Sequence, residues 1–278
     1  YRVVFEDPYC PVNSYVTLFN PCEKLGSSYK RKNSTLPEGY DSFLGWYSDG
    51  SKKSEEYIVT SNMTLTAKYN PKKYTISNNL AYSPTSSYTI EEKVTLETFS
   101  RTGYTFEGWY DNYNYSGQSI TVIPKGSTGD KTFYAKWSVN NYTITYELNG
   151  GTNNDSNKTT YTVNERFGFA DPTKTGYTFE GWYENSDFSD SEITSVSMGS
   201  TGDLTLYAKW TPVKYAINYH FNGGTNSSLN PLTYTIEQEI VLEDPVFTDA
   251  SFLGWYQDSD FSGDRITKIQ KGSTGDIA

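Results

Sequence analysis

The residue types from which many active sites are built are scarce in this chain of 278 residues. It has one histidine and two cysteines, too few for a catalytic triad or a zinc site within any one region. The single histidine, His220, falls at a polar position of an expected strand, and we expect it to be exposed to solvent. Carboxylates are plentiful, but no pair of them recurs at matching positions along the chain. We therefore expect no enzymatic activity and no cofactor.

Long apolar runs and an excess of positive charge are also missing. No segment has the roughly 18 consecutive apolar residues that a transmembrane helix needs. The formal net charge of −10 disfavours binding to nucleic acid or to anionic lipid. We expect neither a nucleic-acid partner nor membrane insertion of this segment. No signal peptide is recognisable and the first residues resemble a strand, so we expect the chain to be a piece of a longer protein.

The two cysteines, Cys10 and Cys22, lie close together near the N-terminus. A disulfide between them would close a short loop and contribute roughly 3 kcal/mol in the chain-entropy description. The sequence supports this bridge and two unpaired thiols equally. The near-absence of cysteine elsewhere is compatible with an exported bacterial protein.

Aromatic side chains are abundant instead. Tyr, Phe and Trp make up 17% of the residues, and many tyrosines alternate with threonines. Aromatic and β-branched residues in alternation are typical of strands. The composition therefore predicts a mostly β protein, α+β at most.

One segment, which we call the signature motif, occurs several times. Gly-Tyr-Thr-Phe-Glu-Gly-Trp-Tyr stands at residues 176–183 and again, unchanged, at 103–110. The shorter Ser-Phe-Leu-Gly-Trp-Tyr stands at 42–47 and 251–256. A second motif, the closing motif, ends in Ala-Lys-Trp or Ala-Lys-Tyr and follows the first three copies. The repeated tryptophans are Trp46, Trp109, Trp182 and Trp255 in the signature motif and Trp137 and Trp210 in the closing motif. Such recurrence predicts tandem copies of one small module.

The repeats divide the chain into four modules. We place module one at 1–70, module two at 71–138, module three at 139–211 and module four at 212–278, the last without its closing strand. Only four residues separate Tyr69 from Tyr74, and the two later junctions are equally short. Four extended residues reach about 14 Å, too little for independent tumbling. We therefore expect the modules to stand end to end as a semi-rigid rod.

Module three gives the clearest prediction of strands. Residues 142–148 alternate between apolar and polar, as in a half-buried strand. Asn149-Gly150-Gly151 predicts a tight turn. A second strand is expected at 160–163, followed by a short helical turn that ends near Pro172.

The signature and closing motifs are predicted to supply the core. Gly181 inside a strand predicts a bulge that turns both Phe179 and Trp182 inward. In the closing strand, the alternation points one set of side chains to the core. That set is Leu204, Leu206, Ala208 and Trp210.

Together these motifs resemble the Listeria–Bacteroides repeat, also called the internalin B-repeat. The resemblance covers modules two to four well and module one loosely, because module one lacks both Asn-Gly-Gly and Gly-Ser-Thr-Gly-Asp. Module two has Leu80-Ala81-Tyr82 where the Asn-Gly-Gly turn would be. The resemblance implies small β-grasp-like modules on secreted or surface-anchored bacterial proteins. It also implies a role as spacer or adhesion segment between other domains of a longer chain.

Two loops resemble ligand-binding motifs. Asp258, Asp260 and Asp264, with a glycine at 263, approximate the first half of a calcium loop, but the acidic twelfth residue is replaced by Ile269. We favour an ordinary Asp/Gly turn. Gly-Ser-Thr-Gly-Asp only superficially resembles a phosphate-binding loop, because it lacks the Lys-Ser/Thr ending and precedes a strand.

Exposed aromatic side chains are the remaining candidates for binding. They are Tyr134 and Tyr207 on the outer face of the closing strand and Tyr113 and Tyr115 in a loop. Such rings can stack on sugars, although cross-strand packing explains them equally well. We expect a non-enzymatic, extracellular tandem-repeat segment that acts as spacer and adhesion scaffold. The alternative is a set of weak glycan- or host-protein-binding modules that gain strength by multivalency.

Overall fold

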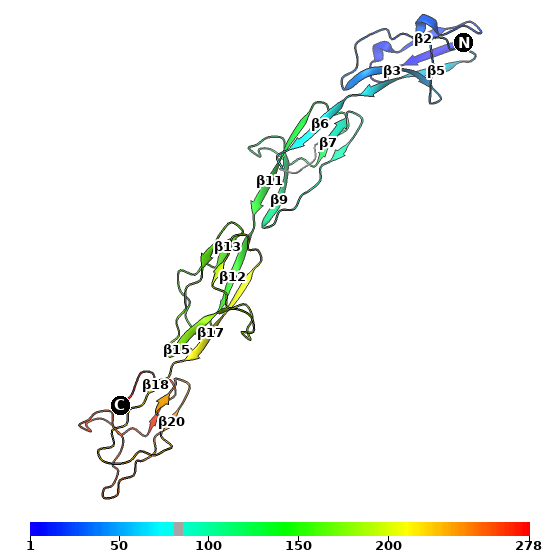
Figure 1. Ribbon diagram of the computed structural model, residues 1–278. Coiled ribbons are helices and arrows are strands. Elements are labelled where there is room, and N and C mark those ends of the chain that lie inside the picture. Colours follow the sequence, from blue (N-terminus) through cyan, green and yellow to red (C-terminus); the bar gives the residue numbers. More distant parts are fainter. Residues whose placement is uncertain (81–85) are drawn as a thin grey trace. The chain divides into compact units, whose positions relative to one another are not determined.

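The computed structural model describes residues 1–80 and 86–278, in two units, Tyr1–Ser138 and Val139–Ala278. Strands are the main regular secondary structure of both units, and loops join them (Figure 1). The described residues contain no α-helix, and their helical turns are the 3-10 turns η1 (Pro11–Asn13) and η2 (Gly26–Tyr29). Ala81 and Tyr82, at the expected turn of module two, lie outside the described residues.

Tyr1–Ser138 holds modules one and two. Its strands are β1 (Arg2–Glu6), β2 (Tyr15–Leu18), β3 (Tyr40–Ser48), β4 (Ser51–Lys52), β5 (Met63–Pro71), β6 (Lys73–Asn78), β7 (Ser86–Thr89), β8 (Val94–Thr95), β9 (Tyr104–Tyr110), β10 (Val122–Ile123) and β11 (Lys131–Val139). They form one sheet in the order β2-β1-β5-β3-β4 and another in the order β7-β6-β11-β9, and β10 pairs with β8.

Val139–Ala278 holds modules three and four. Its strands are β12 (Asn141–Glu147), β13 (Thr160–Thr162), β14 (Phe167–Gly168), β15 (Tyr177–Tyr183), β16 (Ser195–Val196), β17 (Leu204–Pro212), β18 (Tyr215–Ala216), β19 (Thr233–Tyr234), β20 (Ile240–Val241) and β21 (Lys268–Ile269). Module three has the sheet β13-β12-β17-β15, whereas module four has only two-stranded pairs among the described residues.

The closing strand lies in the middle of each complete sheet. In module three, β17 runs parallel to β12, with Leu204 opposite Ile144, and antiparallel to β15. Module one repeats this arrangement, because β5 pairs in parallel with β1 and antiparallel with β3. The last strand of a module therefore joins its first strand to its signature strand.

The signature tryptophans form the centres of the cores. Trp46, Trp109 and Trp182 are buried, whereas Trp255 of module four is only half-buried. Each indole N–H also donates a hydrogen bond to a carbonyl of the segment that precedes the signature strand. The closing-strand tryptophans, Trp137 and Trp210, are partly buried against the cores of their modules.

The predicted bulge at Gly181 is confirmed. The pairing of β15 with β17 shifts register between Phe179 and Gly181, where the glycine has φ of +135°. As a result, the rings of Phe179 and Trp182 meet at 5.3 Å between centroids, although an unbulged strand would place them on opposite faces. A side chain at position 181 would have to displace the Glu192 side chain, because an added Cβ would lie 2.8 Å from its Cγ and Cδ.

The other strand predictions for module three have one exception. The turn at Asn149-Gly150 is confirmed by φ values of +49° and +86°. Along β17, Leu206 and Ala208 are buried, and Leu204 packs against the same core. The prediction of a helical turn before Pro172 is wrong. That segment contains β14, which pairs with β16 and so forms hydrogen bonds to a distant part of the chain instead of to itself.

Candidate functional site

The outer face of module three carries a cluster of aromatic rings around one lysine. Lys209 in β17 places its Nζ 5.1 Å from the ring centroid of Tyr183 and 5.7 Å from that of Phe188. The two rings meet edge to face at 5.5 Å. The ammonium is thus held against two π faces by cation–π attraction. Tyr207 lies directly opposite Tyr183 in the strand pair and flanks this outer-face cluster.

Module two has an equivalent cluster, in which a tyrosine takes the place of Phe188. Lys136 lies 5.6 Å from the Tyr110 centroid, and Tyr110 packs against Tyr115 at 5.8 Å. Lys136 also forms a 3.0 Å ion pair with Glu107. The hydrogen bond from Lys136 lowers the pKa of Glu107, and Glu107 in turn raises the pKa of Lys136.

The loop aromatic of each cluster has an unusual backbone. Tyr115, Phe188 and Phe261 have φ values of +54°, +57° and +60°. Bulky residues seldom adopt the left-handed region, and such strain often coincides with functional positions. In module one the loop is replaced by a tight turn at Asp49-Gly50, without a loop aromatic. The sequence signal is an aromatic residue five positions after the signature tyrosine, and our sequence analysis missed it.

The predicted aromatic residues do not form one surface. Tyr134 and Tyr207 are half-buried on closing strands, whereas 73% of the Tyr113 surface is exposed. Tyr115 belongs to the outer-face cluster of module two. The structure therefore brings Tyr207 and Tyr115 into clusters with lysine and signature tyrosines and leaves Tyr113 by itself at a loop tip.

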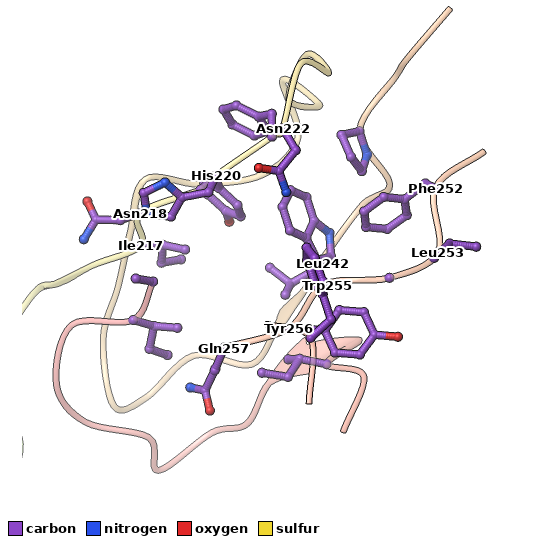
Figure 2. Close-up of a pocket in the computed structure, with 18 of the residues that line it drawn as sticks. Ile217, Asn218, His220, Asn222, Leu242, Phe252, Leu253, Trp255, Tyr256 and Gln257 are labelled. Carbon is purple, nitrogen blue, oxygen red and sulfur yellow. The ribbon is translucent and has the colours of Figure 1, made fainter. Parts of the chain in front are cut away.

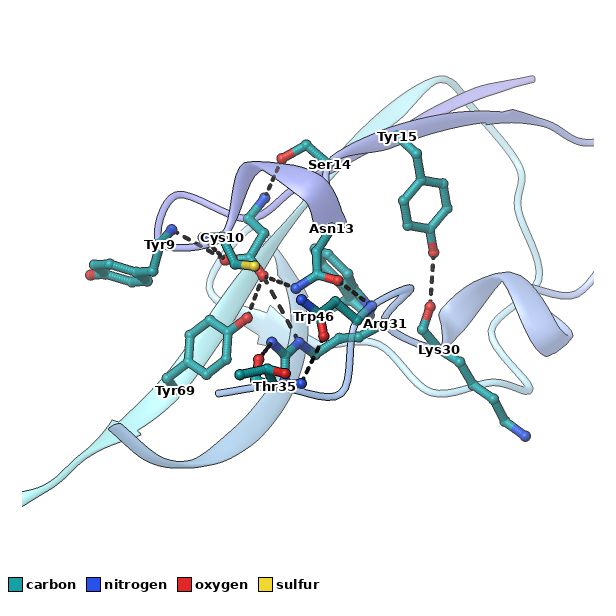
Figure 3. Close-up of polar contacts among 12 residues, drawn as sticks. Tyr9, Cys10, Asn13, Ser14, Tyr15, Lys30, Arg31, Thr35, Trp46 and Tyr69 are labelled. Carbon is teal, nitrogen blue, oxygen red and sulfur yellow. Dashed lines mark hydrogen bonds and ion pairs between the residues drawn. The ribbon is translucent and has the colours of Figure 1, made fainter. Parts of the chain in front are cut away.

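Module one contains a buried polar network around Asp7 (Figure 3). The Asp7 carboxylate accepts hydrogen bonds from the Tyr69 hydroxyl and, at 2.9 Å, from the Asn13 amide. The Arg31 Nε lies 3.9 Å from the same carboxylate, and its guanidinium stacks 5.0 Å from the Tyr69 ring centroid. Burial, together with the bond to Asp7, raises the pKa of Tyr69.

This network is explained by the fold of module one. Asn13 is fully buried, and its side-chain oxygen accepts a 2.6 Å hydrogen bond from the Asn33 backbone. Arg31 donates to the Thr35 carbonyl at 2.7 Å. The network therefore fixes the long segment before β3 to the start of the chain. Cys10 is half-buried beside it, Cys22 is exposed, and the two thiols are not bonded to each other.

A cavity of about 1110 Å³ lies in module four (Figure 2). Ile217, Leu242, Phe252 and Trp255 line it. Ile277 pairs in parallel with Ile217, as Leu204 pairs with Ile144 in module three. The cavity thus occupies the place that the closing strand fills in module three. We interpret it as the open core of an incomplete sheet.

The two loops that resemble ligand sites have structural partners. Hydrogen bonds from the Ser262 side chain and, at 3.0 Å, from its backbone lower the pKa of Asp260. Asp187 and Ser189 form the same turn in module three. In the part of the chain that the structure describes, no three His, Cys, Asp or Glu side chains are placed to share a metal ion. His220 is exposed.

The Gly-Ser-Thr-Gly-Asp turn is held to the sheet of its own module. The Tyr161 hydroxyl donates to the Gly202 carbonyl at 2.6 Å, and Asp203 accepts from the Thr143 backbone at 2.7 Å. Modules two and four repeat both contacts. The backbone N–H groups of Gly199 and Ser200 donate to the carbonyls of Val163 and Ser197, so these two donors of the turn are not free to bind a phosphate.

Comparison with known families agrees with the repeated architecture. The Listeria-Bacteroides repeat domain matches residues 23–68, 70–136, 142–209 and 215–278. The chain belongs to this family. The four matches show that the repeats are tandem copies of the Listeria-Bacteroides repeat, including the divergent first module.

Relatives with these repeats occur in two bacteria. A protein of Evansella cellulosilytica with the provisional name Gly-rich membrane protein is 30% identical over 82% of this chain and 27% of its own length. Internalin H of Listeria monocytogenes is 27% identical over 60% of this chain and 32% of its own length. The chain thus spans about a third or less of these two relatives. Among its described residues, no helix is long and apolar enough to cross a membrane.

Proposed function

We propose that this chain is a non-enzymatic repeat segment of a bacterial surface protein and acts as a spacer and adhesion scaffold. The observation that carries the proposal is the short link between modules. A single residue, Lys72, separates β5 from β6, and two residues separate β17 from β18. Links this short restrict the motion of each module relative to its neighbour, in contrast to a flexible tether.

Two further observations support a structural role. The notable polar groups, such as Asp7 and Asp203, are bound by the fold of their own module. This chain is also similar in sequence to Internalin H and to a protein with a membrane-protein name. We infer an extracellular, cell-surface location and β-grasp-like modules, in which two outer strands flank a parallel central pair.

Surface display of the chain with an epitope tag at its outer end tests the spacer function. We expect antibody access to the tag to fall when residues 139–278 are deleted and to recover when an unrelated folded spacer of similar length replaces them. Access that is unchanged by the deletion would contradict the proposal.

The second candidate function is multivalent binding of a glycan or host protein. The repeated outer-face clusters favour it, because a half-buried lysine on aromatic rings offers both stacking and hydrogen-bond donors. Arrays of glycans and host surface proteins, probed with the whole chain, separate the two functions. A pure spacer gives no saturable signal. Binding that is lost in a Tyr134→Ala/Tyr207→Ala variant would favour the second function.

A further inference from the structure

The end of module three that carries Gly176 and Tyr177 contacts module four through a specific set of residues. The Gly176 carbonyl accepts a 2.9 Å hydrogen bond from the backbone of Val213, in the link between the modules. The Tyr177 hydroxyl donates at 2.8 Å to the carboxylate of Glu237. Ile236 packs on Gly176 so closely that an added Cβ would lie 2.6 Å from its Cδ1 and 3.0 Å from its Cβ.

The junction between modules one and two has the same three contacts. The Gly39 carbonyl accepts from the Lys72 backbone at 2.9 Å, and Tyr40 donates to Glu91 at 3.1 Å. Ile90 would meet a Cβ on Gly39 at 2.6 Å, and it packs against the core of module one. Two junctions with different surrounding sequence therefore use one Gly-Tyr pair against one Ile-Glu pair.

The Ile-Glu pair is itself held in place by its own module. The Ile236 carbonyl accepts a 2.8 Å hydrogen bond from Gly272, in the Gly-Ser-Thr-Gly-Asp turn, and the Ile90 carbonyl accepts one from Gly126 at the same distance. Because this turn is bound to the sheet, the isoleucine is fixed relative to the sheet of its module. The contact between this isoleucine and the glycine of the preceding module thus fixes the sheets of the two modules relative to each other.

We propose that the Gly-Tyr pair (Gly39-Tyr40 or Gly176-Tyr177) and the Ile-Glu pair of the following module form a junction clamp. It sets the angle between modules one and two and between modules three and four. The two glycines have positive φ values, +83° at Gly39 and +78° at Gly176, which favour glycine in their own module. Because they lack a side chain, they also leave space for the isoleucine of the next module. The clamp rests on the proposed spacer function, because a fixed junction is what gives a spacer a defined reach.

The two residue pairs of the clamp are not present in every module. In module four, Asp249 and Ala250 stand where the signature motif of module three has Gly176 and Tyr177. In module one, the turn closed by the Asn20–Glu23 hydrogen bond matches the one closed by Thr89 and Glu92, which places Pro21-Cys22 where module two has its Ile-Glu pair. Modules one and four therefore each lack one of the two residue pairs of the clamp.

Distances between spin labels across the junction of modules three and four test this clamp. The labels are attached in the full chain at Ser191→Cys and Ser259→Cys, both exposed positions, with Cys10 and Cys22 replaced by serine. We expect Gly176→Ala to broaden the distance distribution by about two-fold or more, as for domains whose contact is lost. The matched control is Gly199→Ala, since Gly199 also has a positive φ of +93° but nothing within 4 Å of an added Cβ.

A second variant approaches the clamp from the other side. Ile236→Ala removes the contact without adding bulk to module three, so a broadened distribution with unchanged circular dichroism supports the clamp even if Gly176→Ala misfolds. Distributions for Gly176→Ala and Ile236→Ala that match the Gly199→Ala control would overturn it. That result would leave the spacer proposal to its own surface-display test, because a flexible chain can still act as a spacer.

Discussion

Modules three and four share the signature motif but differ in their cores. In module three, β17 joins β12 to β15, and Trp182 is 2% exposed. In module four, no described strand continues beyond the Ile217–Ile277 bridge, and Trp255 faces the cavity. The tryptophan alone therefore does not build the core. It is buried when the closing strand supplies both the central hydrogen-bonding positions and the side chains that cover it.

Completing module four should have the largest effect. Ile277 matches Leu204, so a copy of residues 206–212 added after Ala278 would provide the missing strand. We expect the free energy of unfolding of module four to rise by more than about 3 kcal/mol, because Leu, Ala and Trp side chains become buried. Hydrogen exchange of residues 215–256 measures this rise. An equally long extension with the apolar positions changed to Asp should leave the exchange unchanged.

The next largest effect is expected from replacing the signature tryptophans, which should destabilise module three more than module four. Trp182→Ala is expected to cost module three about 3 to 5 kcal/mol, as for other buried Trp-to-Ala changes. Trp255→Ala should cost module four less than about half of that, because part of the indole is already exposed. Chemical denaturation of the two variants gives both values, and equal losses would contradict the difference in packing.

A substitution at the bulge should have a smaller effect. Gly181→Ala places a Cβ at φ +135° and 2.8 Å from Glu192, which should cost about 1 to 3 kcal/mol. Gly202→Ala is the control, since its φ is +97° and the added Cβ has open space. If both variants melt at the same temperature, left-handed strain alone would explain the loss and the close approach of Glu192 would be irrelevant.

The smallest expected effect concerns acid stability. The backbone hydrogen bond from Thr143 lowers the pKa of Asp203 from its ordinary value of 3.8. A lowered pKa stabilises the folded state above the ordinary value, and the contribution is lost as the pH falls through the folded value. We expect the melting temperature of module three to drop more steeply below pH 3.8 in the parent than in Asp203→Asn. Parallel melting curves for the two proteins would contradict this.

The sequence predicted the repeated parts of the fold well, because a pattern found in one repeat could be compared with the same positions in the others. Phe179 and Trp182 have opposite parity around Gly181, and that conflict alone indicated the bulge. The strand β14 was missed because its partner, β16, lies far along the chain. The network around Asp7 was missed because module one departs from the repeat, so no other copy indicated that its carboxylate is buried.

The candidate sites were predicted less well. Tyr115 and Tyr207 were identified as outward-facing aromatics, but the lysines against the clusters were not, because cation–π contacts join residues of different strands. The junction contacts of Gly176 involve the next module. Reading each module by itself therefore could not reveal them, although the recurrence of Gly-Tyr was visible.

Small-angle X-ray scattering of the whole chain and of a variant lacking residues 139–211 tests the spacer most directly. If the modules stand in line, as we propose for a spacer, the maximum dimension of the shortened variant should be smaller by about 30 to 35 Å, the span of one module of this size. They also predict that the scattering of both proteins fits extended particles of the same cross-section. A maximum dimension that hardly changes, or a compact particle in either case, would contradict the proposed spacer function.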